Sequence, residues 1–168
     1  MNSIKKTAIV SCYFQHNYGS MLQAYATQKI LDKLGYENET IDISGFRKDI
    51  RISKIKYFMK ASLTSDILLY KTGMFKNVLR KKLLNDEYSL LSSIRDQKFE
   101  EFYKRYFRFS KKYSSIDQLH EECAANYSSV LVGSDQLWLP ANIAADYYTL
   151  SFVPETVNTI AYATSFGQ

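Results

Sequence analysis

The sequence predicts an α/β protein: a Rossmann-like parallel sheet with helices on both faces and a helical insertion. Three observations support this class. Short β-branched apolar runs alternate with segments of helical period, and the first such trio reads strand, helix, strand with tight links. The chain has 168 residues, of which 46% are hydrophobic, so it is long enough for one domain with a real core. We therefore expect residues 1–168 to form a single domain whose first two strands are parallel and joined by a right-handed connection.

The first strand, helix and strand are predicted from residues 6–44. "KTAIVSCYF" is short and β-branched, as expected of a buried strand, and "YENETIDIS" alternates apolar and polar residues, as expected of a second strand. Between them, "SMLQAYATQKILDKLG" predicts a helix with Ser20 as its N-cap and Gly35 at its C′ position. The apolar stripe of this helix consists of Leu22, Tyr25, Ala26, Ile30 and Leu34.

The middle of the chain, from about residue 46 to 112, loses this alternation and predicts a basic helical insertion. Three segments have apolar residues at helical spacing: "ISKIKYFMKASL", "SDILLYKTGMFKNVLRKKLL" and "IRDQKFEEFYKRYF". Residues 46–112 hold 18 Lys and Arg against 7 Asp and Glu. Such a face is either simply solvated or meets an anionic partner. Nucleic acid is not expected, because no recognised nucleic-acid-binding module accompanies the charge.

The alternation returns after the insertion. "SIDQLHEECAAN" predicts a short helix, residues 128–132 a buried strand that breaks at Gly133, and "NTIAYATSFG" a further strand that breaks at Gly167. The apolar run near the start is too short for a signal peptide, and no run is long enough to span a membrane. We therefore expect a cytoplasmic protein whose two cysteines are free thiols.

Three polar, glycine-containing turns follow three predicted strands: "QHNYGS", "GSDQLW" and "TSFG". In an open parallel sheet, ligands bind beyond the carboxyl ends of the strands, so the three turns should lie along one edge. Gly19 permits close approach of a backbone, and the free N–H groups at the start of the next helix favour an anion. The turn lacks the G-x-G-x-x-G pattern of dinucleotide sites. These features predict a binding edge for a small polar ligand.

Three longer stretches resemble the N-terminal half of the polysaccharide pyruvyl transferase family. They are "NYGSMLQAYATQKILDKLGYENETID", "VLVGSDQLWLP" and "YYTLSFVPETVNTIAYATSFG", in that order. The resemblance implies the N-terminal domain of a fold similar to two-domain GT-B glycosyltransferases. It also implies transfer of the pyruvyl group of phosphoenolpyruvate onto two sugar hydroxyls as a ketal, in the biosynthesis of cell-surface glycans. Phosphoenolpyruvate is then the donor substrate, and no cofactor is expected.

Members of the family are roughly twice as long, as two domains require. Their second domain is thought to hold the Arg and His residues that grip the donor. We therefore expect this chain to be the acceptor-side half, incomplete and inactive alone. The alternatives are a non-catalytic glycan or nucleotide-sugar binding half-domain, or one chain of a split enzyme. The implied partners are a sugar or glycan acceptor, lipid-linked or nucleotide-linked, at the inner face of the membrane, together with a second-half chain or another copy of this chain.

Asp135 and His16 are the candidate catalytic residues. Asp135 follows a buried strand and a glycine, where its carboxylate would serve as a base or a hydroxyl acceptor; the alternative is an N-cap for a following short helix. His16 would protonate the enol carbon or stabilise phosphate; the alternative is a solvent-facing loop histidine.

The candidate substrate-binding residues lie in the same three turns and the adjoining helix. Asn17 would hydrogen-bond the ligand or only shape its turn, and Trp138 would stack on a sugar ring or serve as core. Cys12 is predicted to be an inert buried thiol, and no spacing of residues indicates a metal site. The full set is Asn17, Tyr18, Gly19, Ser20, Gln23, Gly133, Ser134, Gln136, Trp138, Ser165 and Gly167.

Overall fold

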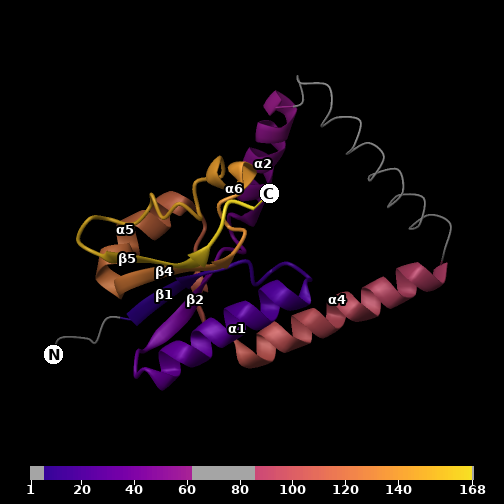
Figure 1. Cartoon of the computed structure of the whole chain (residues 1–168), viewed down its shortest axis with the longest axis horizontal. Coiled ribbons are helices and arrows are strands. Elements are labelled where there is room, and N and C mark those ends of the chain that lie inside the picture. Colours follow the sequence, from indigo (N-terminus) through magenta and orange to yellow (C-terminus); the bar gives the residue numbers. More distant parts are fainter. Residues whose placement is uncertain (1–5, 62–85, 168) are drawn as a thin grey trace.

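The computed structural model describes residues 6–61 and 86–167, and its centre is a sheet of five strands (Figure 1). The strands lie in the order β3-β2-β1-β4-β5, and all four neighbouring pairs are parallel. The strands are β1 (Lys6–Val10), β2 (Asn38–Asp42), β3 (Phe109–Lys112), β4 (Tyr127–Asp135) and β5 (Asn158–Thr164). The helices are α1 (Tyr18–Lys33), α2 (Arg47–Ala61), α4 (Asp86–Tyr106), α5 (Ile116–Asn126) and α6 (Pro140–Ile143). The predicted Rossmann-like α/β class is therefore confirmed.

The strand order reverses direction at β1. From β1 the chain passes through α1 to β2 on one side, whereas β4 lies on the other side of β1 and pairs Val132 with Val10. A crevice for ligands forms at such a reversal, beyond the carboxyl ends of the two strands. The residues that follow Val10 and Val132 are therefore the ones expected to bind a ligand.

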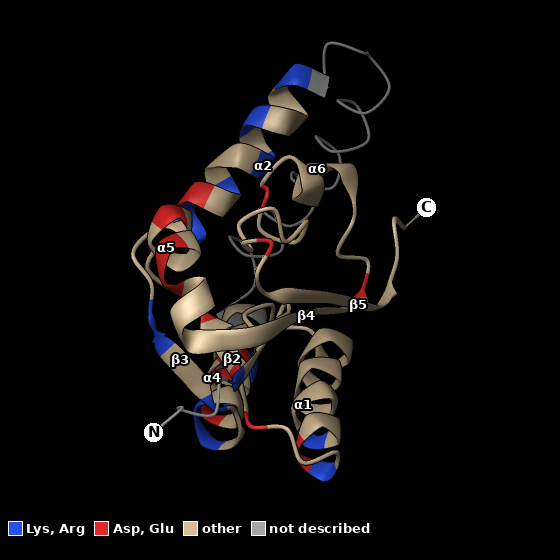
Figure 2. Cartoon of the chain, turned by 90° about the vertical axis from the view of Figure 1, so that its left-hand side faces the viewer, with Lys and Arg blue, Asp and Glu red and all other residues tan. Residues whose placement is uncertain are grey.

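Helices cover both faces of the sheet, with α1 and α5 on opposite sides (Figure 2). Side chains of a strand alternate between the faces, and the core divides accordingly. Ile9 and Leu131 form a small cluster with Leu31 of α1. The larger core contains the alternate residues of β1 and β4, together with Leu119 of α5. Its β1 and β4 members are Ala8, Val10, Val130 and Val132.

Helix α1 begins earlier than predicted. Asn17, with extended backbone, is the N-cap, and its Oδ1 accepts a hydrogen bond of 3.3 Å from the backbone N–H of Ser20. Ser20 therefore lies inside the helix, and the prediction that it is the N-cap is wrong. Gly35 ends the helix as predicted, with φ of +82° and an N–H that donates to the carbonyl of Asp32.

The predicted apolar stripe of α1 is not its buried side. Leu22, Ile30 and Leu34 are exposed, and the side that packs inward is more polar. The buried residues are Ser20, Met21, Ala24, Gln28 and Leu31. Leu34 and Ile30 instead line an apolar groove of about 440 Å³, whose opposite wall includes Ile160 and Tyr162 of β5. The prediction of a helix is confirmed. The side of the helix that faces the sheet, however, is not the predicted apolar stripe.

The described part of the middle of the chain contains two of the three predicted helices and one strand that was not predicted. Helix α2 projects away from the sheet, and α4 lies beside α1 (Figure 1). The helix predicted over residues 65–84 lies outside the described residues. The end of the segment is not helical: β3 pairs with β2 at the margin of the sheet. Strand β3 escaped prediction because it is four residues long and ends in two exposed lysines, as edge strands often do.

No helix in the described parts of the chain is both long and apolar enough to cross a membrane.

Candidate active site at the carboxyl edge of the sheet

The three predicted turns meet at one edge of the sheet. The N–H of Ser165 donates a 3.0 Å hydrogen bond to the carbonyl of Asp135, and the N–H of Trp138 donates a 3.1 Å bond back to the carbonyl of Ser165. The first turn joins them through Ser20, whose Oγ donates a 2.8 Å bond to Oδ2 of Asp135. The turns that contain Ser20, Asp135 and Ser165 are therefore joined to one another at the carboxyl edge of the sheet.

Asp135 is the last residue of β4 and holds a strained backbone with φ of +108°. Strand β4 thus runs two residues beyond Gly133, where the sequence predicted its end. Both carboxylate oxygens are occupied: Oδ2 accepts from Ser20, and Oδ1 accepts a 2.7 Å bond from the N–H of Gln136. The alternative of a helix cap is wrong, because α6 begins at Pro140 with Leu139 as its N-cap. Strained residues held by their surroundings are typical of functional sites.

Two of the predicted binding glycines have structural reasons to be glycine: Gly133 packs against backbone, and Gly167 has a positive φ. A Cβ at Gly133, where φ is +152°, would lie 2.1 Å from the carbonyl oxygen of Tyr162 in β5. At Gly167, with φ of +71°, a Cβ would lie 2.7 Å from Leu139 Cδ2. Both glycines therefore shape the edge of the sheet whether or not they touch a ligand. Ser134 lies between Gly133 and Asp135 in β4.

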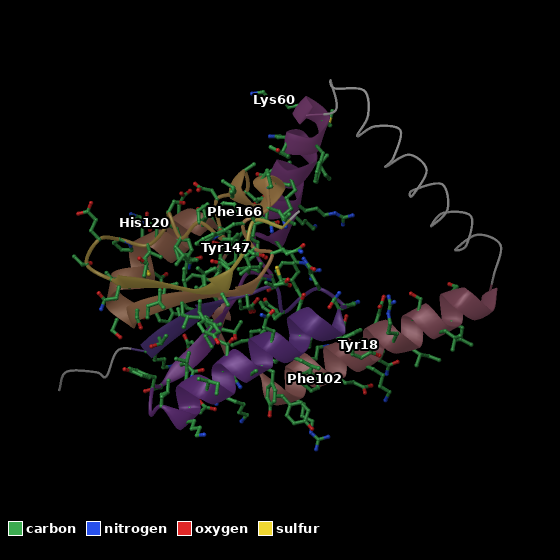
Figure 3. All side chains as sticks on the ribbon, in the orientation of Figure 1. Tyr18, Lys60, Phe102, His120, Tyr147 and Phe166 are labelled. Carbon is green, nitrogen blue, oxygen red and sulfur yellow. The ribbon has the colours of Figure 1, made fainter. Side chains whose placement is uncertain are left out.

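The first turn carries an exposed aromatic side chain. Tyr18 is 70% exposed, and its ring centroid lies 4.8 Å from that of Phe99 in α4. Tyr18 and Phe102 lie along the line where α1 and α4 run side by side (Figure 3). Gly19 is in the first helical turn, where a Cβ would meet only Asn17 Oδ1 at 3.2 Å. Gln23, one turn further on, lines the groove between α1 and β5.

His16 is held by α4 rather than left free in solvent. Its Nδ1 lies 3.0 Å from Oδ1 of Asp96, and its ring stacks on Phe99 with 5.6 Å between centroids. The neighbouring Arg95 guanidinium, together with His16, lowers the pKa of the Asp96 carboxyl. The structure shows no hydrogen bond between His16 and Asp135 and so does not bring the two candidate catalytic residues into contact.

Trp138 packs between two neighbours at the rim of the site. Its Nε1 donates a 3.0 Å hydrogen bond to the carbonyl of Tyr148, and its ring centroid lies 5.5 Å from that of Phe166. The side chain of Trp138 is nevertheless only half-buried. Gln136 and Ser165 are exposed beside it.

Four further residues lie together near the carboxyl end of β1, and the sequence did not predict this cluster. They are Cys12, Gln15, Lys54 and Tyr148. The thiol of Cys12 donates a 3.1 Å hydrogen bond to Oη of Tyr148, and Gln15 Nε2 donates to Cys12 Sγ at 3.6 Å. The Lys54 ammonium of α2 lies 5.5 Å from the centroid of the Tyr148 ring. Cys12 is buried and free, as predicted. Burial raises the pKa of its thiol, although the bond to Tyr148 opposes this.

No signal in the sequence distinguishes Lys54, because it is one of many cations in the basic segment. Tyr148 lies in one of the three stretches that resemble the family, but nothing in the sequence distinguishes it from the adjacent Tyr147. Their proximity to Cys12 depends on how α2 and the loop after α6 pack over the end of β1. In the described part of the chain, no group of three or more His, Cys, Asp or Glu side chains is placed to hold a metal ion.

A parallel sheet with a reversal at β1, and a hydrogen-bonded carboxylate at the end of β4, defines an α/β protein of the class that binds ligands at the carboxyl edge of its sheet. A family model described as polysaccharide pyruvyl transferase matches residues 17–168, from Asn17 of the first turn to the end of the sequence. The chain therefore belongs to the polysaccharide pyruvyl transferase family. No curated protein and no solved structure gives a significant match to it.

Proposed function

We propose that this chain supplies the acceptor side of an enzyme that transfers pyruvyl from phosphoenolpyruvate to a sugar. Two hydroxyl oxygens of the sugar bond to C2 of the donor, and the bond between C2 and the phosphate oxygen breaks. The two sugar hydroxyls lose two protons. In the net reaction the methylene carbon of the donor gains one proton and becomes a methyl group, and the released phosphate carries the other. The product is a ketal. Membership of the family supports the reaction class.

The observation that carries the proposal is the hydrogen-bonded pair of Ser20 and Asp135 at the crevice. A carboxylate at this point can accept the proton of an attacking sugar hydroxyl. Ser20 and the N–H of Gln136 fix its orientation. Fixing a base in advance lowers the entropic cost of reaching the transition state.

His16 is the proposed donor of the proton to the methylene carbon. Its Nδ1 is engaged by Asp96, so Nε2 is the ring nitrogen left to exchange a proton with a substrate. Tyr18, exposed next to it, offers an aromatic face to a sugar ring. In this proposal the acceptor lies between the first turn and the end of β4.

We propose that the protein acts in the cytoplasm, at the inner face of the membrane, on a lipid-linked or nucleotide-linked acceptor. The supporting observation is the charge of α2. Lysines and arginines run along this projecting helix (Figure 2), and Lys60 lies near its far end (Figure 3). Such a helix would attract an anionic acceptor or an anionic lipid surface.

The test is ketal formation by the natural gene product that contains this chain. Phosphoenolpyruvate and a panel of acceptor sugars are supplied, and the product is detected by mass spectrometry alongside phosphate release. Ser20→Ala should lower turnover about tenfold, the expected effect of one lost orienting hydrogen bond. Ser93→Ala, an exposed serine of α4, is the matched control and should be unaffected. Acceptor-dependent phosphate release without any ketal would refute the reaction class.

A further inference from the structure

Lys54 is a half-buried cation that has no anionic partner among the described residues. The other lysines and arginines of α2 are exposed, whereas Lys54 turns inward over the Tyr148 ring. None of the ion pairs in residues 6–61 and 86–167 includes it. Removing an ammonium group from water is costly unless an anion compensates it. Lys54 is therefore a half-buried charge in contact with the Tyr148 ring, and an anion beside it would stabilise the ammonium further.

The surroundings of Lys54 connect it to the candidate active site. Tyr148, under the ammonium, accepts a hydrogen bond from the Cys12 thiol at the end of β1. Cys12 follows Val10 of β1 by two residues, and Asp135 follows Val132, the partner of Val10 in β4, by three. The amine and the carboxylate thus border the same end of β1, where the reversal of strand order leaves a crevice.

The protonation of Lys54 agrees with this geometry. Burial lowers the pKa of its ammonium group, and only the nearby Cys12 acts in the opposite direction. The fold thus disfavours the charged form in the absence of a ligand. A bound anion would stabilise the charged ammonium form, so anion binding and protonation of Lys54 favour each other.

We propose that Lys54 binds a carboxylate or phosphate group of the acceptor, which makes the acceptor an acidic sugar. The inference rests on the proposed function, because it assigns the acceptor to the crevice beside Asp135. One ligand then satisfies both sites: its anionic group pairs with Lys54, and its hydroxyls face Asp135. A neutral sugar would leave the ammonium unpaired and would bind less well. Lys54 is in this way a residue that determines specificity.

Trp138 allows binding to be measured directly, without donor or turnover. It is the single tryptophan of the chain, and its Nε1 donates a hydrogen bond to the carbonyl of Tyr148, the residue under Lys54. Its fluorescence is recorded while the chain is titrated with inorganic phosphate, glucuronate or glucose at constant ionic strength. We expect saturable changes with the anions and none with glucose in the same range. A response to phosphate alone assigns the site to a phosphate group, and a response to glucuronate alone assigns it to a carboxylate.

Variants of two lysines on the same helix test the residue. Lys54→Met should weaken anion binding by roughly 10- to 100-fold, the usual value of a hydrogen bond to a charged group. Lys54→Arg should keep part of the affinity. Lys56→Met, which removes an exposed charge two residues away, should have little effect. Equal anion affinity in the Lys54→Met and wild-type chains would overturn the proposal.

A second measurement uses only the wild-type chain and so does not depend on the folding of a variant. Lysines are methylated with formaldehyde and a mild reductant, with and without glucuronate or phosphate, and each is quantified by mass spectrometry. Protection of Lys54, but not of Lys56, is the expected result. Modification of Lys54 that is unchanged at saturating anion would contradict the proposal. An enzyme that forms ketals only on neutral sugars would overturn this inference while leaving the proposed reaction intact.

Discussion

The hydroxyl of Ser20 donates a 2.8 Å hydrogen bond to the carboxylate of Asp135, a residue 115 positions further along the chain. Ser20 lies in the first turn of α1, and Asp135 ends β4. This hydrogen bond connects the segment that leads from β1 to β2 with the end of β4, which lies on the other side of β1. Since Gln136 occupies the other carboxylate oxygen, an amide at this position cannot satisfy both donors.

Asp135→Asn should impair turnover far more than stability. Asparagine tolerates positive φ and keeps the size of the side chain, but it cannot accept the proton of a sugar hydroxyl. Ketal formation by the natural gene product should fall by a factor on the order of 10² to 10⁴. Unfolding in urea should show a loss of about 1 kcal/mol, from the one hydrogen bond that is lost.

Asp117→Asn is the control for this change, because Asp117 is exposed in α5. Normal turnover of the Asp135→Asn protein would remove Asp135 from the catalytic residues. A structural role alone would then account for its two hydrogen bonds.

Asn17 combines a structural role with a proposed binding role, and two substitutions separate them. Asn17→Ala removes the cap of α1 and should lower the free energy of unfolding by about 1 kcal/mol. Asn17→Asp retains the capping oxygen but loses the amide donor, so stability should be preserved. If Asn17 donates to the ligand, both variants should bind the acceptor more weakly. Full binding by Asn17→Asp would leave Asn17 as a cap only.

Two glycines of the site should respond in opposite ways to alanine. Gly133→Ala places a Cβ against the Tyr162 carbonyl and should cost more than about 3 kcal/mol, because β4 and β5 must separate. Gly19→Ala meets only the end of the Asn17 side chain and gains helix propensity, so stability should change by less than about 0.5 kcal/mol. Thermal unfolding of both variants checks this contrast. Weaker acceptor binding by the stable Gly19→Ala protein would place the ligand against the backbone of this turn.

The pH dependence of stability should reflect Asp32 at the end of α1. Its carboxylate accepts from both terminal nitrogens of Arg108 and from Asn38 Nδ2 at 2.9 Å. Chiefly through Arg108, these contacts lower the pKa of Asp32 below its usual 3.8. The contribution to stability is thus fully present above the pKa of the unfolded chain and is lost as the pH falls through that of the folded chain.

Urea unfolding from about pH 3 to pH 6 tests this assignment. Asp32→Asn should be less stable than the wild-type chain at pH 6, and the difference should shrink towards pH 3. A difference that stays constant over the whole range would show that the charge of Asp32 contributes nothing.

Local features of the sequence determined the class of the fold and the position of the three turns. The order strand, helix, strand follows from short-range periodicity, and Gly35 ends α1 because its positive φ disfavours other residues. The turns that contain Asn17, Asp135 and Ser165 each follow a strand, and parallel strands bring such turns to one edge. These outcomes need only neighbouring residues and the geometry of a parallel sheet.

Other features were decided only by tertiary packing. The exposed stripe of α1 has the same helical spacing as its buried side, and only contact with the sheet and with α4 determines which side is covered. The Ser20 hydroxyl becomes a partner of Asp135 because Asn17 takes the role of cap. Lys54 differs from the other cations of α2 because this turn of the helix packs over Tyr148. Burial and pairing depend on atoms contributed by distant segments, so a local pattern cannot fix them.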